Sequence, residues 1–434
     1  MPTAEPSFAI QASAGESRSA DILVFAIPFL QWVQLNVVGV LYASELLLVA
    51  TFVYLVFTRK LELSKPIARQ FVALCTTWLV SQVVTDFVRH TAFSDYARGW
   101  SKIVMTLISF AVLYVLLDGR EQRLVSYGWG LVTGSTLGFL IDPGQWGREY
   151  PWKFGMSFPV TLGAFLLASR KNCARSWPIS ISVIIGCINI AAGARSRGAV
   201  CLAVALYLLI SSPQSQKRDD IPKMKAASLV AIIALGALAV AAVLWTYQYA
   251  ARSGILGHAA MVEYEEQSAG DYGVLLGGRS AVLGSIPAIY DSPILGHGSW
   301  ARDPTYVLAQ LQAMAAMGYE NTSAVEEEEL DEGYIPAHSY LFGAWVEGGV
   351  VGAIFWAWVL ILAVKGLVRT YLSNTLLLPL VAFCAVSLAW DILFSPYGAQ
   401  QRIIVPFYIV LLMTHVGIAR LHVSPLATAK ARAS

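Results

Sequence analysis

Charged residues are scarce in this sequence. Asp, Glu, Lys and Arg make up 13% of its 434 residues and hydrophobic residues make up 56%, whereas roughly a quarter of an ordinary soluble domain is charged. The deficit extends along the whole chain, which excludes an ordinary soluble domain built around one buried core. The formal net charge of +2 is also too small to indicate a nucleic acid as partner.

Several chemical signatures are missing as well. The five cysteines form no Cys-x-x-Cys pair, which argues against disulfides and against a zinc site. The sequence contains no nucleotide-phosphate loop, no Gly-x-Ser-x-Gly elbow and no His-Glu-x-x-His helix. We therefore expect neither a metal nor another cofactor. The first twenty residues lack the positive start of a signal peptide, and we interpret them as a short cytoplasmic tail.

Apolar segments long enough to cross a bilayer recur from Asp21 almost to the end of the chain, since a spanning helix needs about 20 residues. A helix satisfies its own backbone hydrogen bonds in lipid, and the period-two alternation of a β-barrel is absent. The sequence therefore predicts an all-α polytopic membrane protein. About 12 spans are expected: 21–36, 38–57, 68–88, 101–117, 123–141, 154–169, 177–193, 198–212, 226–249, 338–364, 374–392 and 403–419.

The basic residues divide unequally between the two sides of the membrane. Most of the 30 lysines and arginines fall in loops and tails on the N-terminal side, which predicts that both termini are cytoplasmic. The long connection 250–337 then lies on the outer side, where its apolar stretch 304–317 predicts short helices on the membrane surface or in a small cap. No repeat or linker divides the chain, so residues 1–434 are expected to form a single integral membrane domain.

Arginines occur on the outer side, where topology alone does not require them. Arg195 and Arg197 lie in a short turn among small residues, and Arg279 follows two glycines in the long outer loop. Guanidinium groups bind phosphate oxygens bidentately and stay charged at any working pH, so these residues are candidates for a phosphate site. The alternative is that they extend to lipid headgroups, as arginines at membrane ends often do.

His338 lies where the long loop enters the expected span 338–364. Histidine exchanges protons near neutral pH and is a candidate general base for a hydroxyl nucleophile, although a histidine that only caps the helix is the alternative. Glu347 follows nine residues later, about 900° around an ideal helix, and so points away from His338. We expect Glu347 to face the bundle interior as a supporting residue, because an unpaired carboxylate in the membrane is costly.

Other acidic residues leave two alternatives open. The run of six carboxylates at 326–332 fits a solvated acidic turn better than a metal site, because contiguous carboxylates cannot all converge on one ion. Glu45, Asp86 and Asp391 lie within or near expected spans, and scattered carboxylates of this kind also occur in secondary transporters. A transporter is disfavoured, since no pair of matching interrupted helices marks two inverted halves.

Four short motifs follow one another in an informative order. They are Ser196-Arg197-Gly198 at the start of a span, Gly278-Arg279 followed by Pro293, Gly296 and Gly298, then His338-Ser339-Tyr340-Leu341, and finally Glu347-Gly348-Gly349. With this order and a long outer loop before the histidine, the chain resembles the O-antigen ligase/polymerase superfamily, in particular its ligase branch. The motif matches cover residues 190–360. Ser339 differs from many relatives, which have asparagine after the histidine.

The resemblance implies a GT-C-like, metal-independent glycosyltransferase of the cell inner membrane with a periplasmic active site. Such an enzyme moves a glycan from undecaprenyl pyrophosphate to a sugar hydroxyl of lipid A–core, with inversion, so the expected partners are this donor, this acceptor and membrane lipid. His338 would then deprotonate the acceptor hydroxyl. The pyrophosphate-binding candidates are Arg197 and Arg279 by motif, Arg195 more weakly as a neighbour, and Arg148 and Arg402 only by side and charge. The nearest alternative is an O-antigen polymerase or a protein O-oligosaccharyltransferase of the same superfamily.

Overall fold

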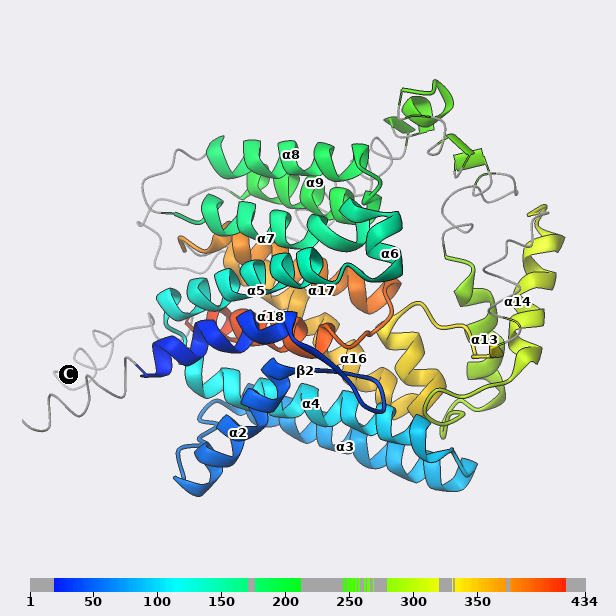
Figure 1. The fold of residues 1–434 in the computed structure, drawn as a ribbon, viewed down its shortest axis with the longest axis horizontal. Coiled ribbons are helices and arrows are strands. Elements are labelled where there is room, and N and C mark those ends of the chain that lie inside the picture. Colours follow the sequence, from blue (N-terminus) through cyan, green and yellow to red (C-terminus); the bar gives the residue numbers. More distant parts are fainter. Residues whose placement is uncertain are drawn as a thin grey trace, which may run out of the picture.

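A computed structural model describes most of the chain. The described residues are 19–170, 176–211, 245–246, 248–255, 257, 261–262, 264–265, 268, 279–319, 330, 332–371 and 375–418. Most of them are helical, and the long helices lie side by side in one bundle (Figure 1). Several of these helices are apolar, which indicates a membrane-embedded protein.

The elements follow one another in this order. An N-terminal helix Ser19–Trp32 ends in the 3-10 turn η1 (Leu30–Trp32) and is followed by β1 (Gln34–Asn36), β2 (Val40–Tyr42), α2 (Ala43–Phe57), α3 (Pro66–Arg89), α4 (Phe93–Leu117) and α5 (Glu121–Ile141). Next come α6 (Gly144–Glu149), a π-helical turn (Pro151–Met156), α7 (Ser157–Ala168), α8 (Ser176–Ala191) and α9 (Arg195–Ile210). The described C-terminal part contains α13 (Ala281–Asp291), α14 (Pro304–Ala316), α16 (Tyr340–Tyr371), α17 (Leu378–Phe394) and α18 (Gln401–Ile418).

Four helices are both long and apolar enough to cross a membrane, namely α3, α4, α5 and α16. The described helices overlap the expected spans, except for span 226–249, which lies almost entirely outside the described residues. The prediction of a largely helical membrane protein is thus confirmed, whereas the number of 12 spans stays a prediction. The first two expected spans are joined near Asn36 by a two-stranded antiparallel hairpin, in which Gln34 pairs with Tyr42 and Asn36 with Val40, so their facing ends are strands and not helix.

The interior of the bundle is formed largely by α17 and α18. Helix α18 packs against α4 and α16, and α17 packs against α16, α7 and α9. Side chains of α18 from Ile403 to Met413 are buried on all sides of the helix, which is typical of a helix in the centre of a large bundle. The outer helices α3, α5 and α8 instead keep large exposed apolar side chains such as Phe87, Leu140 and Ile184, consistent with contact to lipid.

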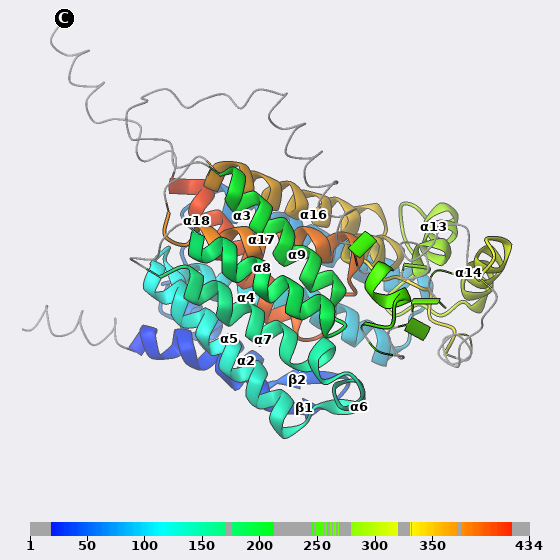
Figure 2. The ribbon, with the colours of Figure 1, turned by 90° about the horizontal axis from the view of Figure 1, so that it is seen from above.

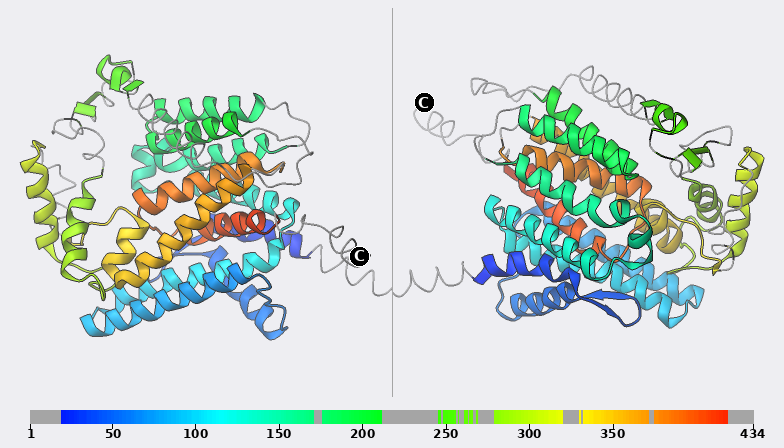
Figure 3. Two further views of the ribbon diagram at one scale, coloured as in Figure 1. Left: turned by 180° about the vertical axis from the view of Figure 1, so that it is seen from behind. Right: turned by 45° about the horizontal axis from the view of Figure 1, so that its top comes forward.

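One end of the bundle carries the irregular elements. The hairpin β1–β2, α6, α13 and α14 lie at this end, and α13 and α14 project beyond it (Figures 2 and 3). The start of the N-terminal helix and the end of α18 lie at the opposite end (Figure 1). The side of the membrane on which each end lies stays a prediction.

Helix α16 is interrupted near its start by the loop 293–298. Gly349 has φ 70°, outside the helical region, and Gly298 N donates to Glu347 O at 3.0 Å across the break. A Cβ atom at Gly349 would lie 1.9 Å from Ile294 O. Gly349 is therefore required at this position, because only glycine permits both this backbone conformation and the close approach of the loop that contains Gly298.

Candidate active site

His338 lies between two anchored residues, just before α16. Pro336 O accepts a hydrogen bond from Ser285 Oγ of α13 at 2.5 Å. On the other side, Ser339 Oγ donates to Ile392 O of α17 at 2.7 Å and accepts from a backbone N–H in the first turn of α16 at 3.2 Å. The position of His338 is thus fixed by α13 and α17, and Ser339 caps the helix that follows.

Arg279, in the turn before α13, lies close to His338. Burial by surrounding protein atoms and, after it, the positive charge of Arg279 lower the pKa of His338. The residue as a whole is still exposed to solvent, so the protein atoms around it lower the pKa of His338 without burying the residue. The neutral imidazole is therefore favoured around neutral pH, which is the form that accepts a proton.

The guanidinium group of Arg279 is held by aromatic rings and by α9. It lies 5.6 Å from the ring centroids of both Trp390 and Phe394 at the end of α17, and Nη2 donates to Ser196 Oγ at 3.2 Å. Cation–π contacts of this kind orient a guanidinium without neutralising its charge. Its burial lowers the pKa of Arg279, but a guanidinium starts high enough to stay protonated.

Arg197 lies in the first turn of α9, next to Ser196. Its guanidinium is 5.3 Å from the ring centroid of Phe158 on α7. Both Arg197 and Ser196 line a cavity of about 430 Å³. Because Arg279 donates to Ser196, which lines this cavity together with Arg197, the site draws on two segments that are far apart in the sequence.

The cavity lies at the end of the bundle that carries the hairpin and α6. Its wall includes Lys153, Asp391 and Trp390, the ring on which Arg279 lies. The amide side chains of Gln31, Gln34, Gln400 and Gln401 add uncharged donors and acceptors. A pocket of several hundred Å³ with a few convergent polar groups is typical of a small-molecule site. This one combines cationic groups, which suit phosphate, with amides, which suit hydroxyls.

A family model described as O-antigen ligase matches residues 181–357. This region contains Arg197, Arg279, His338 and the loop docked into α16. The segment 181–357 is thus similar to the O-antigen ligase family. This similarity implies a glycosyltransferase-like enzyme whose substrates are, in general terms, a lipid-linked glycan and lipid A–core. No curated protein matches this chain.

Two further arginine candidates, Arg195 and Arg148, have surroundings that differ from those of Arg197 and Arg279. Arg195 begins α9 and is partly exposed, and Arg148 is exposed in the last turn of α6. Neither of them lines the cavity, whereas Lys153 does. Lys153 was not among the residues selected from the sequence, although it is a basic residue only five positions after Arg148.

Arg402 has a structural partner, which corrects its assignment as a pyrophosphate ligand. Its Nε lies 2.7 Å from Oε1 of Glu45, and Nη2 donates to Glu45 Oε2 at 2.9 Å and to Val40 O at 2.6 Å. Glu45 also accepts from Tyr42 N at 2.9 Å. Arg402 thus ties α18 to α2 and to the hairpin, and its charge is already compensated inside the bundle.

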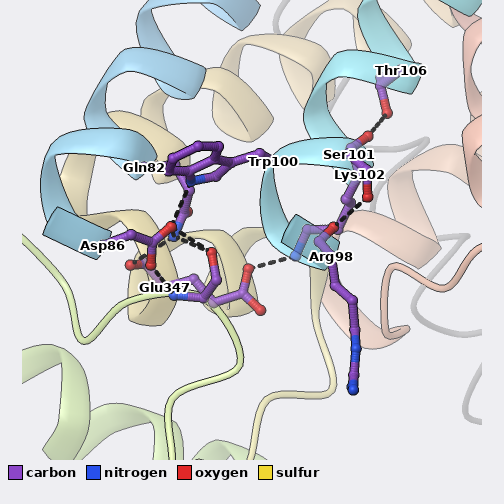
Figure 4. Close-up of polar contacts among 9 residues, drawn as sticks. Gln82, Asp86, Arg98, Trp100, Ser101, Lys102, Thr106 and Glu347 are labelled. Carbon is purple, nitrogen blue, oxygen red and sulfur yellow. Dashed lines mark hydrogen bonds and ion pairs between the residues drawn. The ribbon is translucent and has the colours of Figure 1, made fainter. Parts of the chain in front are cut away.

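Glu347 is paired with Lys102 rather than with His338. Lys102 Nζ lies 2.5 Å from Glu347 Oε2 (Figure 4). The prediction that Glu347 supports the structure and forms no dyad with the histidine is confirmed by this contact. The pair joins α4 to α16 at the point where α16 is interrupted.

Asp86 holds the loop that follows α13. Its Oδ1 accepts from Ser299 N at 2.6 Å, and its Oδ2 accepts from Ser299 Oγ and from Trp100 Nε1, each at 2.7 Å (Figure 4). Gln82 Nε2 also donates to Ser299 Oγ at 2.9 Å. Asp86, like Glu45 and Glu347, therefore has fixed partners.

The acidic run 326–332 lies largely outside the described residues, which include only Leu330 and Glu332 of it. Within the described part of the chain, no three His, Cys, Asp or Glu side chains gather in a way that could hold a metal ion.

Proposed function

We propose that this protein is an inverting glycosyltransferase that transfers an O-antigen glycan from undecaprenyl pyrophosphate to a sugar hydroxyl of lipid A–core at the periplasmic face. The observation that carries the proposal is the position of His338 beside Arg279, which is itself bonded to the residue next to Arg197. His338 and Arg279 thus lie close together, and Arg279 contacts the wall of the cavity that Arg197 lines, within the segment that is similar to the O-antigen ligase family.

In this reaction His338 removes the proton from the acceptor hydroxyl. The acceptor oxygen forms a bond to the anomeric carbon of the donor, and the bond from that carbon to the pyrophosphate oxygen breaks on the opposite side. The leaving undecaprenyl pyrophosphate gains negative charge, which Arg197 and Arg279 stabilise. Fixed cations act more strongly on the transition state than on the bound donor, because the charge on the leaving oxygen is still growing there.

Arg279 has two complementary effects in this scheme. Its charge attracts the pyrophosphate, and the same charge lowers the pKa of His338, so that the base stays neutral. Once the proton is transferred, the imidazolium and the anionic pyrophosphate attract each other, so the product state is also compatible with the site.

A secondary transporter is less well supported. Of the carboxylates that favoured it, Glu45 is paired with Arg402, Asp86 accepts hydrogen bonds from Ser299, and Glu347 is paired with Lys102. A carboxylate that carries an ion across a membrane has to exchange partners. These three instead join neighbouring elements.

The direct test is transfer from a purified lipid-linked donor to purified lipid A–core by the full-length protein in detergent, without added metal or nucleotide. We expect His338→Asn to lower the rate at least 100-fold at unchanged protein abundance. His90→Asn is the matched control, because His90 is exposed at the end of α3 with φ 53°, a conformation that asparagine tolerates. Full activity of His338→Asn would contradict the mechanism.

The acceptor is tested in a strain that lacks the protein. Lipid-linked polymer that accumulates while lipopolysaccharide lacks attached O-antigen is the result expected for a ligase. A core that carries a single repeat would instead identify a polymerase, and an unmodified protein acceptor would identify an oligosaccharyltransferase.

A further inference from the structure

A second cavity lies at the same end of the molecule as the His338 site and shares no lining residue with the cavity of Arg197. It has a volume of about 280 Å³ and lies between the end of α3, the start of α4 and the loop 297–303. Its wall combines one large aromatic residue, Trp300, with charged residues of both signs, among them Arg302, Asp95 and Asp303.

Trp300 is held in a strained conformation that leaves its ring accessible. Its φ is 51°, in the left-handed region that a bulky residue rarely adopts, and its side chain is 40% exposed. The backbone is fixed on both sides, because Ser299 N donates to Asp86 Oδ1 at 2.6 Å and Ile335 N donates to Ala301 O at 3.0 Å. Strain of this kind persists only where the surroundings impose it, and it is concentrated at binding sites.

Basic groups surround the indole ring. The guanidinium of Arg98 lies 5.5 Å from the ring centroid of Trp300. Tyr334 meets the indole edge to face at 5.8 Å, and Arg302 lies 4.6 Å above the Tyr334 ring while its Nη2 donates to the Tyr334 hydroxyl at 2.7 Å. The indole thus has a guanidinium over one face, a second aromatic ring against it, and a second guanidinium over that neighbouring ring.

Carboxylates lie on the same wall and decide which ligand fits. Asp303 Oδ1 caps α14 by accepting from Thr305 N and Oγ1. Among the described residues, Asp95 receives a single long hydrogen bond, from Ser94 Oγ at 3.4 Å. A site for an anion would not include these carboxylates, and a site for a lipid tail would not include the arginines. A pyranose ring satisfies both, since its C–H face packs on an aromatic ring while its hydroxyls donate to carboxylates and accept from guanidinium groups.

The cavity is close to the proposed general base. Ile335, on its wall, lies three residues before His338, and three residues span at most about 11 Å of chain. Arg302 and Tyr334 also form a bridge between the loop and this same segment. A sugar on Trp300 would therefore be a short distance along the glycan from the sugar that reacts next to His338.

We propose that this cavity is a carbohydrate subsite in which a sugar residue of a substrate glycan stacks on Trp300 and hydrogen-bonds to Asp95, Asp303 and the neighbouring arginines. The inference rests on the proposed function only for the source of the sugar, which is either the acceptor core or the donor glycan. Its role is to bind and align a substrate, so it contributes to affinity rather than to the chemical step.

The test uses the full-length protein in detergent and two delipidated probes, the core oligosaccharide of the acceptor and the repeat oligosaccharide of the donor. Their dissociation constants are measured by calorimetry for the wild type and for Trp300→Gly. Glycine adopts φ 51° readily, so this change removes the ring without backbone strain, and the melting temperature should not fall. The controls are Trp300→Phe, which keeps an aromatic surface, and Trp146→Ala, which removes another exposed tryptophan at the same end.

We expect Trp300→Gly to raise the dissociation constant of one oligosaccharide at least tenfold, Trp300→Phe less than threefold, and Trp146→Ala less than twofold. The oligosaccharide affected identifies the source of the sugar. Absence of binding to the wild type, or equal binding to Trp300→Gly, would overturn the proposal. A change confined to partition into phosphatidylethanolamine–phosphatidylglycerol vesicles would show that Trp300 is an interfacial anchor and would also overturn it. Because binding is measured without turnover, failure of the proposed transfer reaction leaves this result readable.

Discussion

Lys102 and Glu347 form an ion pair at the interruption of α16, with 2.5 Å between Nζ and Oε2. Their side chains are only 14% and 17% exposed. The same interruption receives the loop 293–298, so the pair stabilises the junction between α4, that loop and the helix that begins beside His338. Two largely buried charges that compensate each other become costly as soon as one is removed.

The first prediction concerns this pair. Glu347→Gln should lower the free energy of unfolding by about 2 kcal/mol, less than for a fully buried pair because both side chains keep some solvent contact. The control is Asp118→Asn, since the Asp118–Arg120 pair is 61% and 55% exposed and should contribute less than about 1 kcal/mol. Thermal melting in detergent measures both. Adding Lys102→Gln to Glu347→Gln should recover part of the loss, and equal shifts in Glu347→Gln and Asp118→Asn would contradict the assignment.

The second prediction concerns the interruption itself. Gly349→Ala should prevent the loop from docking, because its Cβ would lie 1.9 Å from Ile294 O, and we expect a loss of folded protein and of transfer. Gly144→Ala is the matched control: Gly144 has a similar φ of 64° but no atom within 4 Å of the added Cβ. It should therefore show only the conformational cost of about 1 kcal/mol. Folded yield and thermal melting after membrane extraction separate the two outcomes.

Part of this fold follows from local sequence patterns. Apolar runs located the helices, since a helix in lipid satisfies its own backbone and needs no distant partner. The short gap near Asn36 left a hairpin and a broken helix both open, and the sequence could not decide between them because the two strands have only three residues each. The interruption of α16 could be suspected from Gly348-Gly349 but not established, because it depends on the loop 293–298, some fifty residues earlier.

The candidate site shows the same division. Motif order selected Arg197, Arg279 and His338, and the structure places Arg279 close to His338 and bonds it to the neighbour of Arg197. Side and charge alone also selected Arg402, which is paired with Glu45. The sequence cannot tell an arginine in a binding site from one in a buried ion pair. For Arg402 the difference depends on the position of Glu45, 357 residues away.

The third prediction is a pH dependence. Burial and the charge of Arg279 lower the pKa of His338 from its ordinary value. The base therefore stays neutral to a lower pH than an ordinary histidine would, and the transfer rate should decline only when the pH falls below this lowered pKa. Under saturating donor, the rate should then fall about tenfold per pH unit, as expected for one protonated base. Removing the charge in Arg279→Gln should move this acidic limb to higher pH, while burial keeps it below that of a free histidine.

The control for this effect is Arg279→Lys, which keeps a positive charge but loses the planar fork that binds phosphate. Its maximal rate should fall while the acidic limb stays near that of the wild type. An identical pH profile in Arg279→Gln and in the wild type would show that Arg279 does not influence the base.

The last prediction separates the arginines by their environment. Arg402→Gln leaves Glu45 as an unpaired carboxylate that is fully buried, and breaking such a pair costs about 3–5 kcal/mol, so we expect little folded protein. Arg197→Gln removes a cavity-lining cation that lies 5.3 Å from the ring centroid of Phe158. It should fold normally but lower transfer at least 100-fold, since the pyrophosphate loses a charge partner. Arg148→Gln, exposed and outside the cavity wall, should retain at least a third of the activity. Folded yield by size-exclusion chromatography and the transfer rate per folded molecule distinguish the three variants, and a loss of transfer in Arg148→Gln as large as in Arg197→Gln would show that the pyrophosphate site extends to α6.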